Sequence, residues 1–268
     1  MTISPAANVG WVHDVFSNSI MLLDFTEPGT ELLVESRLLM ERFEATTVPK
    51  EPRGQIIDSY PFEYPKELIL DLAGTERRHY PDPGGKIAAW ARRFVKDAED
   101  SASLLSAIMH GVQDSFSYNA RYEEGTQPPA ETLAKEAGTC RDYALFMMEA
   151  VRSLGFAARF VHGYLYDPSV DGLPGGARGA GATHAWVQVF LPLSGWVEYD
   201  PTNALVGGQN LIRVAVARDP TQAIPLAGTF EGATNASLGM EVEVVVNSVD
   251  PGTVATWGGA VAAPMRLG

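Results

Sequence analysis

The sequence contains a single cysteine, Cys140, among its 268 residues. One cysteine cannot form an internal disulfide, and it cannot build a zinc site from several thiolates. On composition alone, a lone cysteine is best explained as a small buried hydrophobic residue. A catalytic role therefore has to be argued from the residues around it.

Basic residues are also scarce, with 20 Lys and Arg against 33 Asp and Glu, which gives a formal net charge of −13. A chain this acidic repels nucleic-acid phosphates and anionic membrane surfaces, so we expect neither as a partner. No stretch approaches the roughly 18 consecutive apolar residues that a membrane span needs. The first residues lack the basic start and apolar run of a secretory signal, and we expect a cytoplasmic protein or one whose leader has been removed.

The N-terminal part of the sequence, up to about residue 75, is mostly strand-like. Apolar or alternating stretches occur at 18–24 and 31–43, separated by a Glu-Pro-Gly-Thr turn. A proline-rich connector from 46 to 65 follows. We predict an N-terminal β-rich domain over 1–75 and a second domain over 76–268.

Beyond residue 84 the hydrophobic period becomes helical and later returns to the strand type. Apolar spacing predicts helices within 87–95, 104–112, 131–137 and 140–154, the last followed by Gly155. Strand-like patterns follow at 156–166, 183–191, 195–200 and 241–249. Helices that precede strands in this way favour an α+β fold.

Cys140 directly follows Gly138 and Thr139 and opens the strongest predicted helix. The unpaired N–H groups and positive dipole end of a helix start favour a thiolate, and the same N–H groups can bind an oxyanion. This position is compatible with a nucleophile and equally with a packing cysteine. Asp142, in the first turn, could cap the helix start or form a salt bridge.

His184 and Asp200 are the best candidates for a base and the group that orients it. A nucleophilic cysteine needs such a pair, and of the five histidines only His184 begins a strand beside a second strand that ends in an acid. A hairpin loop at 191–193 would place His184 directly opposite Asp200, with Cβ atoms ~5 Å apart. Trp186 and Trp196 would share their face, and the valines of both strands would form the packing face.

Three ordered segments carry a resemblance to a known family. They are Ala-Gly-Thr-Cys-Arg-Asp-Tyr-Ala at 137–144, Thr-His-Ala-Trp-Val at 183–187, and Gly-Trp-Val-Glu-Tyr-Asp-Pro-Thr-Asn at 195–203. Together they resemble the transglutaminase-like superfamily, most closely its bacterial branch described as cysteine proteases. The resemblance implies a papain-like, transglutaminase-like α+β core with Cys140, His184 and Asp200 as its triad, preceded by a small N-terminal β domain.

Weaker similarity extends over most of the chain. Asp14 to Asn18 resembles the Asp-x-x-Gly-Asn turn of the branch's N-terminal domain, with Ser17 where glycine is usual. That domain looks shortened at its start. Residues 210–225 resemble the strand that follows the triad, so the second predicted domain, 76–268, would be the transglutaminase-like core with a C-terminal strand.

The resemblance implies an amide-bond hydrolase that forms a thioester on Cys140 and acts on a peptide or protein amide. It implies no cofactor and no metal. Three alternatives remain: acyl transfer to an amine, an arylamine-acetyltransferase type of enzyme that would need coenzyme A, and a non-catalytic interaction module on the same fold.

Further residues could contribute to the same site. Tyr118 could line the site or help hold the oxyanion, and Trp186 and Trp196 could form walls of the cleft, although core packing is an alternative for all three. The glycine-rich segment 167–181 ends shortly before His184. It could border the cleft as a mobile lid or be a plain surface loop.

Overall fold

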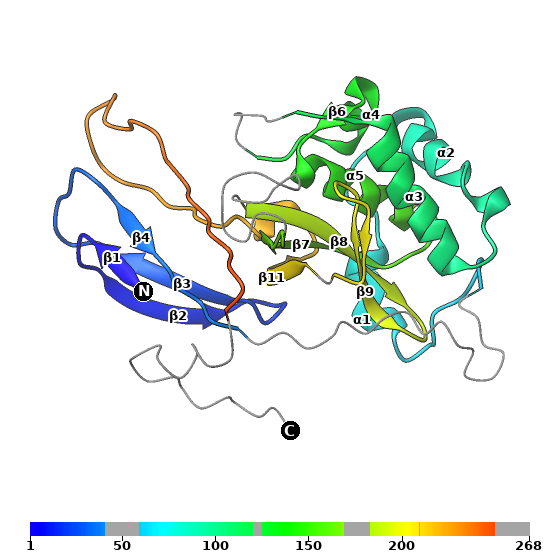
Figure 1. Ribbon diagram of the computed structural model, residues 1–268, viewed down its shortest axis with the longest axis horizontal. Coiled ribbons are helices and arrows are strands. Elements are labelled where there is room, and N and C mark those ends of the chain that lie inside the picture. The colour runs from blue at the N-terminus through cyan, green and yellow to red at the C-terminus, as the bar shows by residue number, and fades with distance from the viewer. Residues whose placement is uncertain (41–58, 120–124, 169–182, 209, 250–268) are drawn as a thin grey trace.

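The computed structural model describes residues 1–40, 59–119, 125–168, 183–208 and 210–249 (Figure 1). The helices between residues 86 and 152 gather on one side of a central sheet, and the N-terminal strands form a separate group beside it, at the left of Figure 1. This arrangement confirms the predicted α+β class, with a helical and sheet core and small N-terminal strands.

The helices of the described residues are α1 (Ile69–Glu76), α2 (Lys86–Arg92), α3 (Ser101–Ser115), α4 (Pro129–Lys135) and α5 (Cys140–Arg152). Short 3-10 turns lie at Pro83–Gly85, Val95–Asp97 and Pro220–Gln222. The strands are β1 (Thr2–Ser4), β2 (Asn8–His13), β3 (Ser19–Asp24), β4 (Leu33–Glu35), β5 (Ser117–Tyr118), β6 (Ala137–Gly138), β7 (Ala158–Leu165), β8 (Thr183–Leu191), β9 (Gly195–Asp200), β10 (Leu205–Val206) and β11 (Leu211–Ala217).

The central sheet has five strands in the order β10-β9-β8-β7-β11, and all neighbours are antiparallel. On one face, Val187, Val189 and Val197 pack in the main core cluster with α5, as the alternating pattern predicted. On the other face, Trp186 is fully buried in a second apolar cluster that includes Val161. Both faces of β8 are therefore covered, which holds this strand rigidly at the centre of the molecule.

Helix α5 is the central helix of the core. From Asp142 to Arg152 its residues are all buried, because the helix packs against β7 and β8 and also against α2, α3 and α4. A helix enclosed on all sides is expected to be apolar around its whole circumference, and this one largely is. It ends close to Gly155, which has a φ of 91° and so fits the glycine expected just past the helix.

The N-terminal hairpin of β2 and β3 is attached to the core through its turn. The Asp14 carboxylate accepts hydrogen bonds from the backbone N–H groups of Phe16 (2.8 Å) and Asn18 (2.9 Å). Ser17 has a φ of 63°, which explains why glycine would suit this position. The Asn18 side-chain amide then bonds both backbone groups of Val216 on β11, at 2.6 Å to its carbonyl and 2.9 Å from its N–H.

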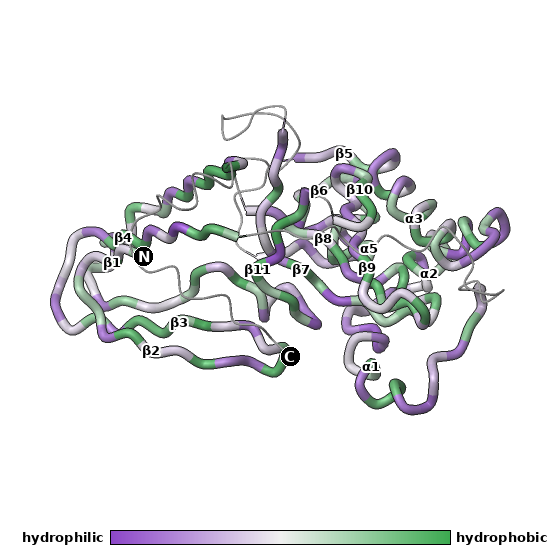
Figure 2. Tube along the Cα trace, turned by 60° about the horizontal axis from the view of Figure 1, so that its bottom comes forward, coloured by the Kyte–Doolittle hydropathy of each residue, from purple (hydrophilic) through white to green (hydrophobic). Residues whose placement is uncertain are grey.

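Apolar side chains on this hairpin are exposed in the structure. Trp11 is 59% exposed and Leu22 is 51% exposed, and hydrophobic segments are visible along both strands in Figure 2. A two-stranded sheet is too thin to bury both of its faces, so these residues stay at the surface among the residues that the structure describes.

In these terminal regions one strand prediction is confirmed only in part and another is wrong. Of the segment 31–43, only Leu33–Glu35 forms a strand within the part that the structure describes. Residues 241–249 form no strand, although they alternate in polarity. Alternation favours a strand only when a neighbouring edge offers hydrogen bonds and a core offers a surface to pack on.

The segment before α1 packs on the core. The ring of Phe62 lies 5.0 Å from that of Phe156, and the Tyr64 hydroxyl donates to the carbonyl of Phe190 at 2.9 Å. This packing favours a boundary of the N-terminal unit earlier than residue 75, and the division at 75 stays a prediction.

Candidate active site

The loop before α5 positions Cys140 at the first residue of the helix. Strands β5 and β6 pair in parallel immediately upstream, with Tyr118 opposite Gly138. The buried Asp142 carboxylate then accepts hydrogen bonds from the backbone N–H groups of Thr139 (2.9 Å) and Gln127 (2.6 Å). Of the two roles considered for Asp142, a cap of the helix start or a salt bridge, the structure shows the cap.

Gly138 is required by this packing. A Cβ atom at this position would lie 2.7 Å from Cβ of Asp142, which is closer than such atoms approach. The glycine therefore lets the entry strand run against the cap, and the cap in turn fixes the backbone around Cys140.

His184 and Asp200 meet in the interior. Nε2 of His184 lies 2.8 Å from Oδ2 of Asp200, and neither side chain is exposed. Asp200 is itself held in place, because its Oδ1 accepts from the Thr202 N–H at 2.9 Å and its Oδ2 from the Asn203 side-chain amide at 2.9 Å. These hydrogen bonds fix the orientation of the Asp200 carboxylate, which in turn fixes the orientation of the His184 imidazole.

The predicted register of this hairpin was wrong by two residues. Leu191 pairs with Gly195 and Val187 with Tyr199, so the loop covers 192–194 and His184 lies diagonal to Asp200 rather than directly opposite. Because side chains alternate with a period of two, a shift of two residues keeps both groups on one face. Long side chains can bridge such a diagonal, and the contact survives the error.

The protonated form of His184 is favoured. Burial lowers the pKa of this imidazole, but the charge and hydrogen bond of Asp200, followed by the hydrogen bond and charge of Cys140, outweigh it and raise the pKa to about 10. The second ring nitrogen, Nδ1, is buried and has no hydrogen-bond partner of good geometry among the described residues. With Nε2 occupied by Asp200, Nδ1 is the atom left for the thiol.

A pocket of about 210 Å³ opens over these groups. Its described lining consists of Gly125, Thr139, Cys140, Arg141, His162, Thr183 and His184. The pocket thus contains a thiol, an imidazole and the first turn of a helix, which is the set that acyl transfer through a thioester needs.

His162 and Arg141 were not singled out from the sequence. His162 lies in the middle of β7 and is 4% exposed, so it resembled an ordinary core residue. Its pocket-facing position follows only from the pairing of β7 with β8, where it lies next to Ala185. Arg141 directly follows the predicted nucleophile, and this adjacency is the only feature of the sequence that suggests a role for it.

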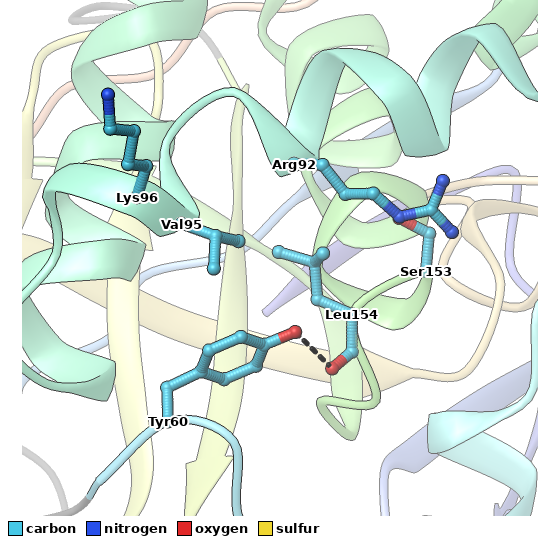
Figure 3. Close-up of a pocket in the computed structure, with 6 residues that line it drawn as sticks. All are labelled: Tyr60, Arg92, Val95, Lys96, Ser153 and Leu154. Atoms are coloured by element: carbon cyan, nitrogen blue, oxygen red, sulfur yellow. Dashed lines mark hydrogen bonds between the residues drawn. The ribbon is translucent and has the colours of Figure 1, made fainter.

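A larger hollow of about 510 Å³ lies at the opposite end of α5 (Figure 3). Its described lining is Tyr60, Arg92, Val95, Lys96, Ser153 and Leu154, and the Tyr60 hydroxyl donates to the Leu154 carbonyl at 3.2 Å. This lining includes neither cysteine nor histidine. Size alone would favour this hollow, but the chemistry favours the smaller pocket.

The three tentative site residues differ in their placement. Trp186 is fully buried, and its ring stacks on that of His184 at 5.9 Å, so it supports the imidazole from behind. Tyr118 is half-buried and packs edge-on against Tyr143 at 6.1 Å. Trp196 lies at the other end of β9, under the Arg159 guanidinium at 4.1 Å. None of the three is among the described residues that line the pocket.

Most of the predicted lid, 167–181, lies outside the described residues, which resume at 183. Among the described residues, no group of three or more His, Cys, Asp or Glu side chains could hold a metal ion. Within the same residues, no helix has both the length and the apolar character to cross a membrane.

Comparison with known proteins identifies the family. The model of the transglutaminase-like superfamily matches residues 88–201, which include Cys140, His184 and Asp200. The uncharacterized protein Rv2569c of Mycobacterium tuberculosis is 35% identical over 259 residues, covering 91% of this chain and 80% of the relative. The chain belongs to the transglutaminase-like superfamily.

Two further similarities concern a second mycobacterial relative and a solved structure. The uncharacterized protein ML0607 of Mycobacterium leprae is 28% identical over 233 residues, covering 86% of this chain and 79% of the relative. The crystal structure of a "putative cysteine protease" from Cytophaga hutchinsonii superimposes with a TM-score of 0.54 at 18% identity, covering 83% of this chain and 70% of that one. At this identity the match concerns the fold alone.

Proposed function

We propose that this transglutaminase-like protein is a cysteine-dependent amide-bond hydrolase of the peptidase or amidase type, acting in the cytoplasm on a peptide or protein amide. Cys140 is the nucleophile, His184 the base and acid, and Asp200 the group that orients the imidazole. The observation that carries the proposal is the buried 2.8 Å contact between His184 and Asp200 on the wall of the pocket that contains Cys140.

The reaction then follows from the positions of these groups. The Cys140 thiolate, paired with the His184 imidazolium, attacks the amide carbon and forms a tetrahedral intermediate. The N–H groups at the start of α5, including that of Cys140, stabilise its oxyanion. His184 gives its proton to the leaving amine, and a thioester remains on Cys140.

Water completes the cycle. Neutral His184 takes a proton from a water molecule, which attacks the thioester, and the acid product leaves as Cys140 regains its starting state. Throughout, Asp200 keeps Nε2 of His184 occupied, so that Nδ1 is the nitrogen that exchanges protons with sulfur, leaving group and water.

The first test is the rate of Cys140 alkylation by iodoacetamide as a function of pH. A free thiol titrates at about 8.5, so a paired thiolate should react fast with a midpoint well below that value. The His184→Ala variant should move the midpoint upward. His110→Ala is the matched control, because His110 is an exposed histidine of α3. A midpoint like that of a free thiol in wild type and in His184→Ala would contradict the proposal and favour an interaction module.

A second test separates hydrolysis from transamidation. The protein is incubated with a glutamine-containing peptide library and a labelled primary amine. Release of acid products without label supports hydrolysis, whereas incorporation of the amine means that the thioester passes to an amine acceptor. Turnover that depends on coenzyme A would indicate the arylamine-acetyltransferase alternative.

A further inference from the structure

Beyond the proposed triad, the pocket has a wall that the reaction above does not use. It is formed by His162 of β7 and Arg141 of α5. His162 is 4% exposed, and within the described part of the chain its ring packs against that of Tyr164 at 6.4 Å without a hydrogen bond or ion pair. Its ring nitrogens are not among the fully buried atoms that lack a partner, and His162 lines the pocket, so a ligand in the pocket could bond them.

Arg141 is a half-buried cation without a carboxylate partner in the described part of the chain. Its guanidinium donates to the backbone carbonyls of Pro220 at 3.0 Å and Ala223 at 3.5 Å, and it lies 4.9 Å from the ring centre of Phe160. These contacts hold the side chain in place, and among the described residues no carboxylate forms an ion pair with it, although the charges of Cys140 and Asp142 act on it from nearby. A desolvated charge of this kind gains most from an anion that binds beside it.

The rest of the pocket is consistent with an anionic ligand. No described residue of its lining is acidic, although the whole chain carries a formal charge of −13. Burial, followed by the positive charges of Arg141 and His184, lowers the pKa of His162 to about 4. His162 is therefore a neutral imidazole at neutral pH, able to donate one hydrogen bond beside two cationic groups.

We propose that Arg141 and His162 form a subsite for a carboxylate of the substrate, so that the enzyme prefers amides carrying a negative charge close to the scissile bond. This inference rests on the proposed function, because it assigns the substrate class of the same pocket. The volume of about 210 Å³ suits one small acidic group, such as a carboxylate side chain or a free chain terminus.

The charge preference of Cys140 alkylation tests this subsite without any knowledge of the substrate. Iodoacetate and iodoacetamide are nearly the same size and differ in charge, and the single cysteine makes either rate unambiguous. The ratio of the iodoacetate rate to the iodoacetamide rate is measured for native protein and for the same protein unfolded in urea. We expect the native ratio to be on the order of tenfold higher, as a cationic cleft concentrates anions.

Variants then assign the preference to Arg141. Arg141→Gln should bring the ratio down to the unfolded value, Arg141→Lys should retain part of it, and His162→Gln should lower it by less than Arg141→Gln. Arg92→Gln is the control, since it removes the same charge from an exposed position at the far end of α5 and should leave the ratio unchanged. Should Arg141→Gln fail to fold, wild-type protein still gives an answer: succinate should protect Cys140 from iodoacetamide, and succinamide should not.

The outcomes separate the two proposals. Equal ratios in native and unfolded protein, or a high ratio that Arg141→Gln does not change, overturn the carboxylate subsite and leave the triad standing. A native Cys140 that reacts with neither reagent overturns both.

Discussion

The two ends of α5 both carry buried charges, yet they differ in how those charges are satisfied. At the C-terminal end, the Arg152 guanidinium bonds Glu149 at 2.9 Å and donates to the backbone carbonyls of Thr75, Ala158 and Arg218 at 2.8 Å each. Glu149 also accepts from two backbone N–H groups of the segment after α1. This network ties the helix to its neighbours, and Arg78 lies 3.5 Å from the Glu149 carboxylate as a second cation.

At the N-terminal end the arrangement is open. Asp142 is fully engaged in the cap, but Nδ1 of His184, the His162 ring and the Arg141 charge border a pocket. Polar groups around the C-terminal end of α5 therefore hold the helix in place, whereas those around its N-terminal end, from β7, β8 and the helix itself, border a pocket. The comparison teaches that the candidate site is marked by a thiol and an imidazole that border a pocket, more than by the number of buried charges or the size of a hollow.

The largest expected effect comes from changing the triad at the N-terminal end of α5. Asp200→Asn should lower the rate of acylation of Cys140 by p-nitrophenyl acetate by about 10²- to 10⁴-fold, because the amide no longer supports the protonated imidazole. Stopped-flow release of nitrophenol measures this rate. Glu198→Gln, on the same strand, should change it less than about twofold. A tenfold effect of Glu198→Gln, or none of Asp200→Asn, would contradict the proposed roles.

Breaking the Arg152–Glu149 network at the C-terminal end of α5 should affect stability instead of chemistry. Arg152→Met leaves the buried Glu149 carboxylate with only the longer 3.5 Å contact to Arg78, so the free energy of unfolding should fall by about 3–5 kcal/mol. Urea denaturation measures the change. The control Arg92→Met, at an exposed position, should cost under about 0.5 kcal/mol. A loss below about 1 kcal/mol for Arg152→Met would show that the network contributes little.

Loosening the cap should produce an intermediate effect that links stability to reactivity. Asp142→Ala removes the acceptor of the Thr139 and Gln127 N–H groups, so we expect a loss of about 1–3 kcal/mol. Alkylation of Cys140 should slow in parallel, since its backbone loses support. Asp142→Asn retains one acceptor oxygen and should show a smaller loss. Unchanged unfolding in Asp142→Ala would argue against the cap as the anchor of the loop.

The free energy of unfolding should also depend on pH through the pair of His184 and Asp200. The folded protein raises the pKa of His184 to about 10, against about 6.5 for an unfolded histidine. Its stabilisation is therefore complete below pH ~6.5 and is lost as pH rises through the folded pKa, with a slope of at most about 1.4 kcal/mol per pH unit.

A Cys140→Ala background removes the titration of the thiol from this measurement. Unfolding free energies of Cys140→Ala and Cys140→Ala/Asp200→Asn are compared from pH 6 to 10. The first should decline more steeply than the second, because Asp200 supplies the largest favourable contribution to protonation of His184. Parallel curves would mean that the imidazole is not held as a cation in the fold.

Much of the core could be predicted from residue patterns, because its elements follow local rules. The spacing of apolar residues located α5, and Gly155 fixed its end to within a few residues. Alternation located β8 and β9, and parity brought His184 and Asp200 to one face even with the wrong loop. A register error of two residues leaves every side chain on the same face of the sheet, so alternation alone cannot detect it.

The rest depended on contacts that no local pattern contains. Whether His162 faces a pocket or a core is decided by β8 and by the start of α5, both far from it along the chain. Trp196 lies on the same strand as Asp200 and points to the same face, but it is at the opposite end of that strand, beside Arg159. For residues 241–249, alternation was present but a pairing edge was not, and periodicity alone cannot distinguish these cases.

The amide of Asn18 has a consequence for how the sheet stops growing. β11 is the edge of the central sheet, and at Val216 a single side chain occupies both the donor and the acceptor that a sixth strand would use. The side-chain amide of Asn18 thus takes the place of the backbone amide of a neighbouring strand at this one position. Replacing Asn18 would leave these two backbone groups of the edge strand free to pair with another chain. We therefore expect self-association of an otherwise folded protein rather than any change at Cys140.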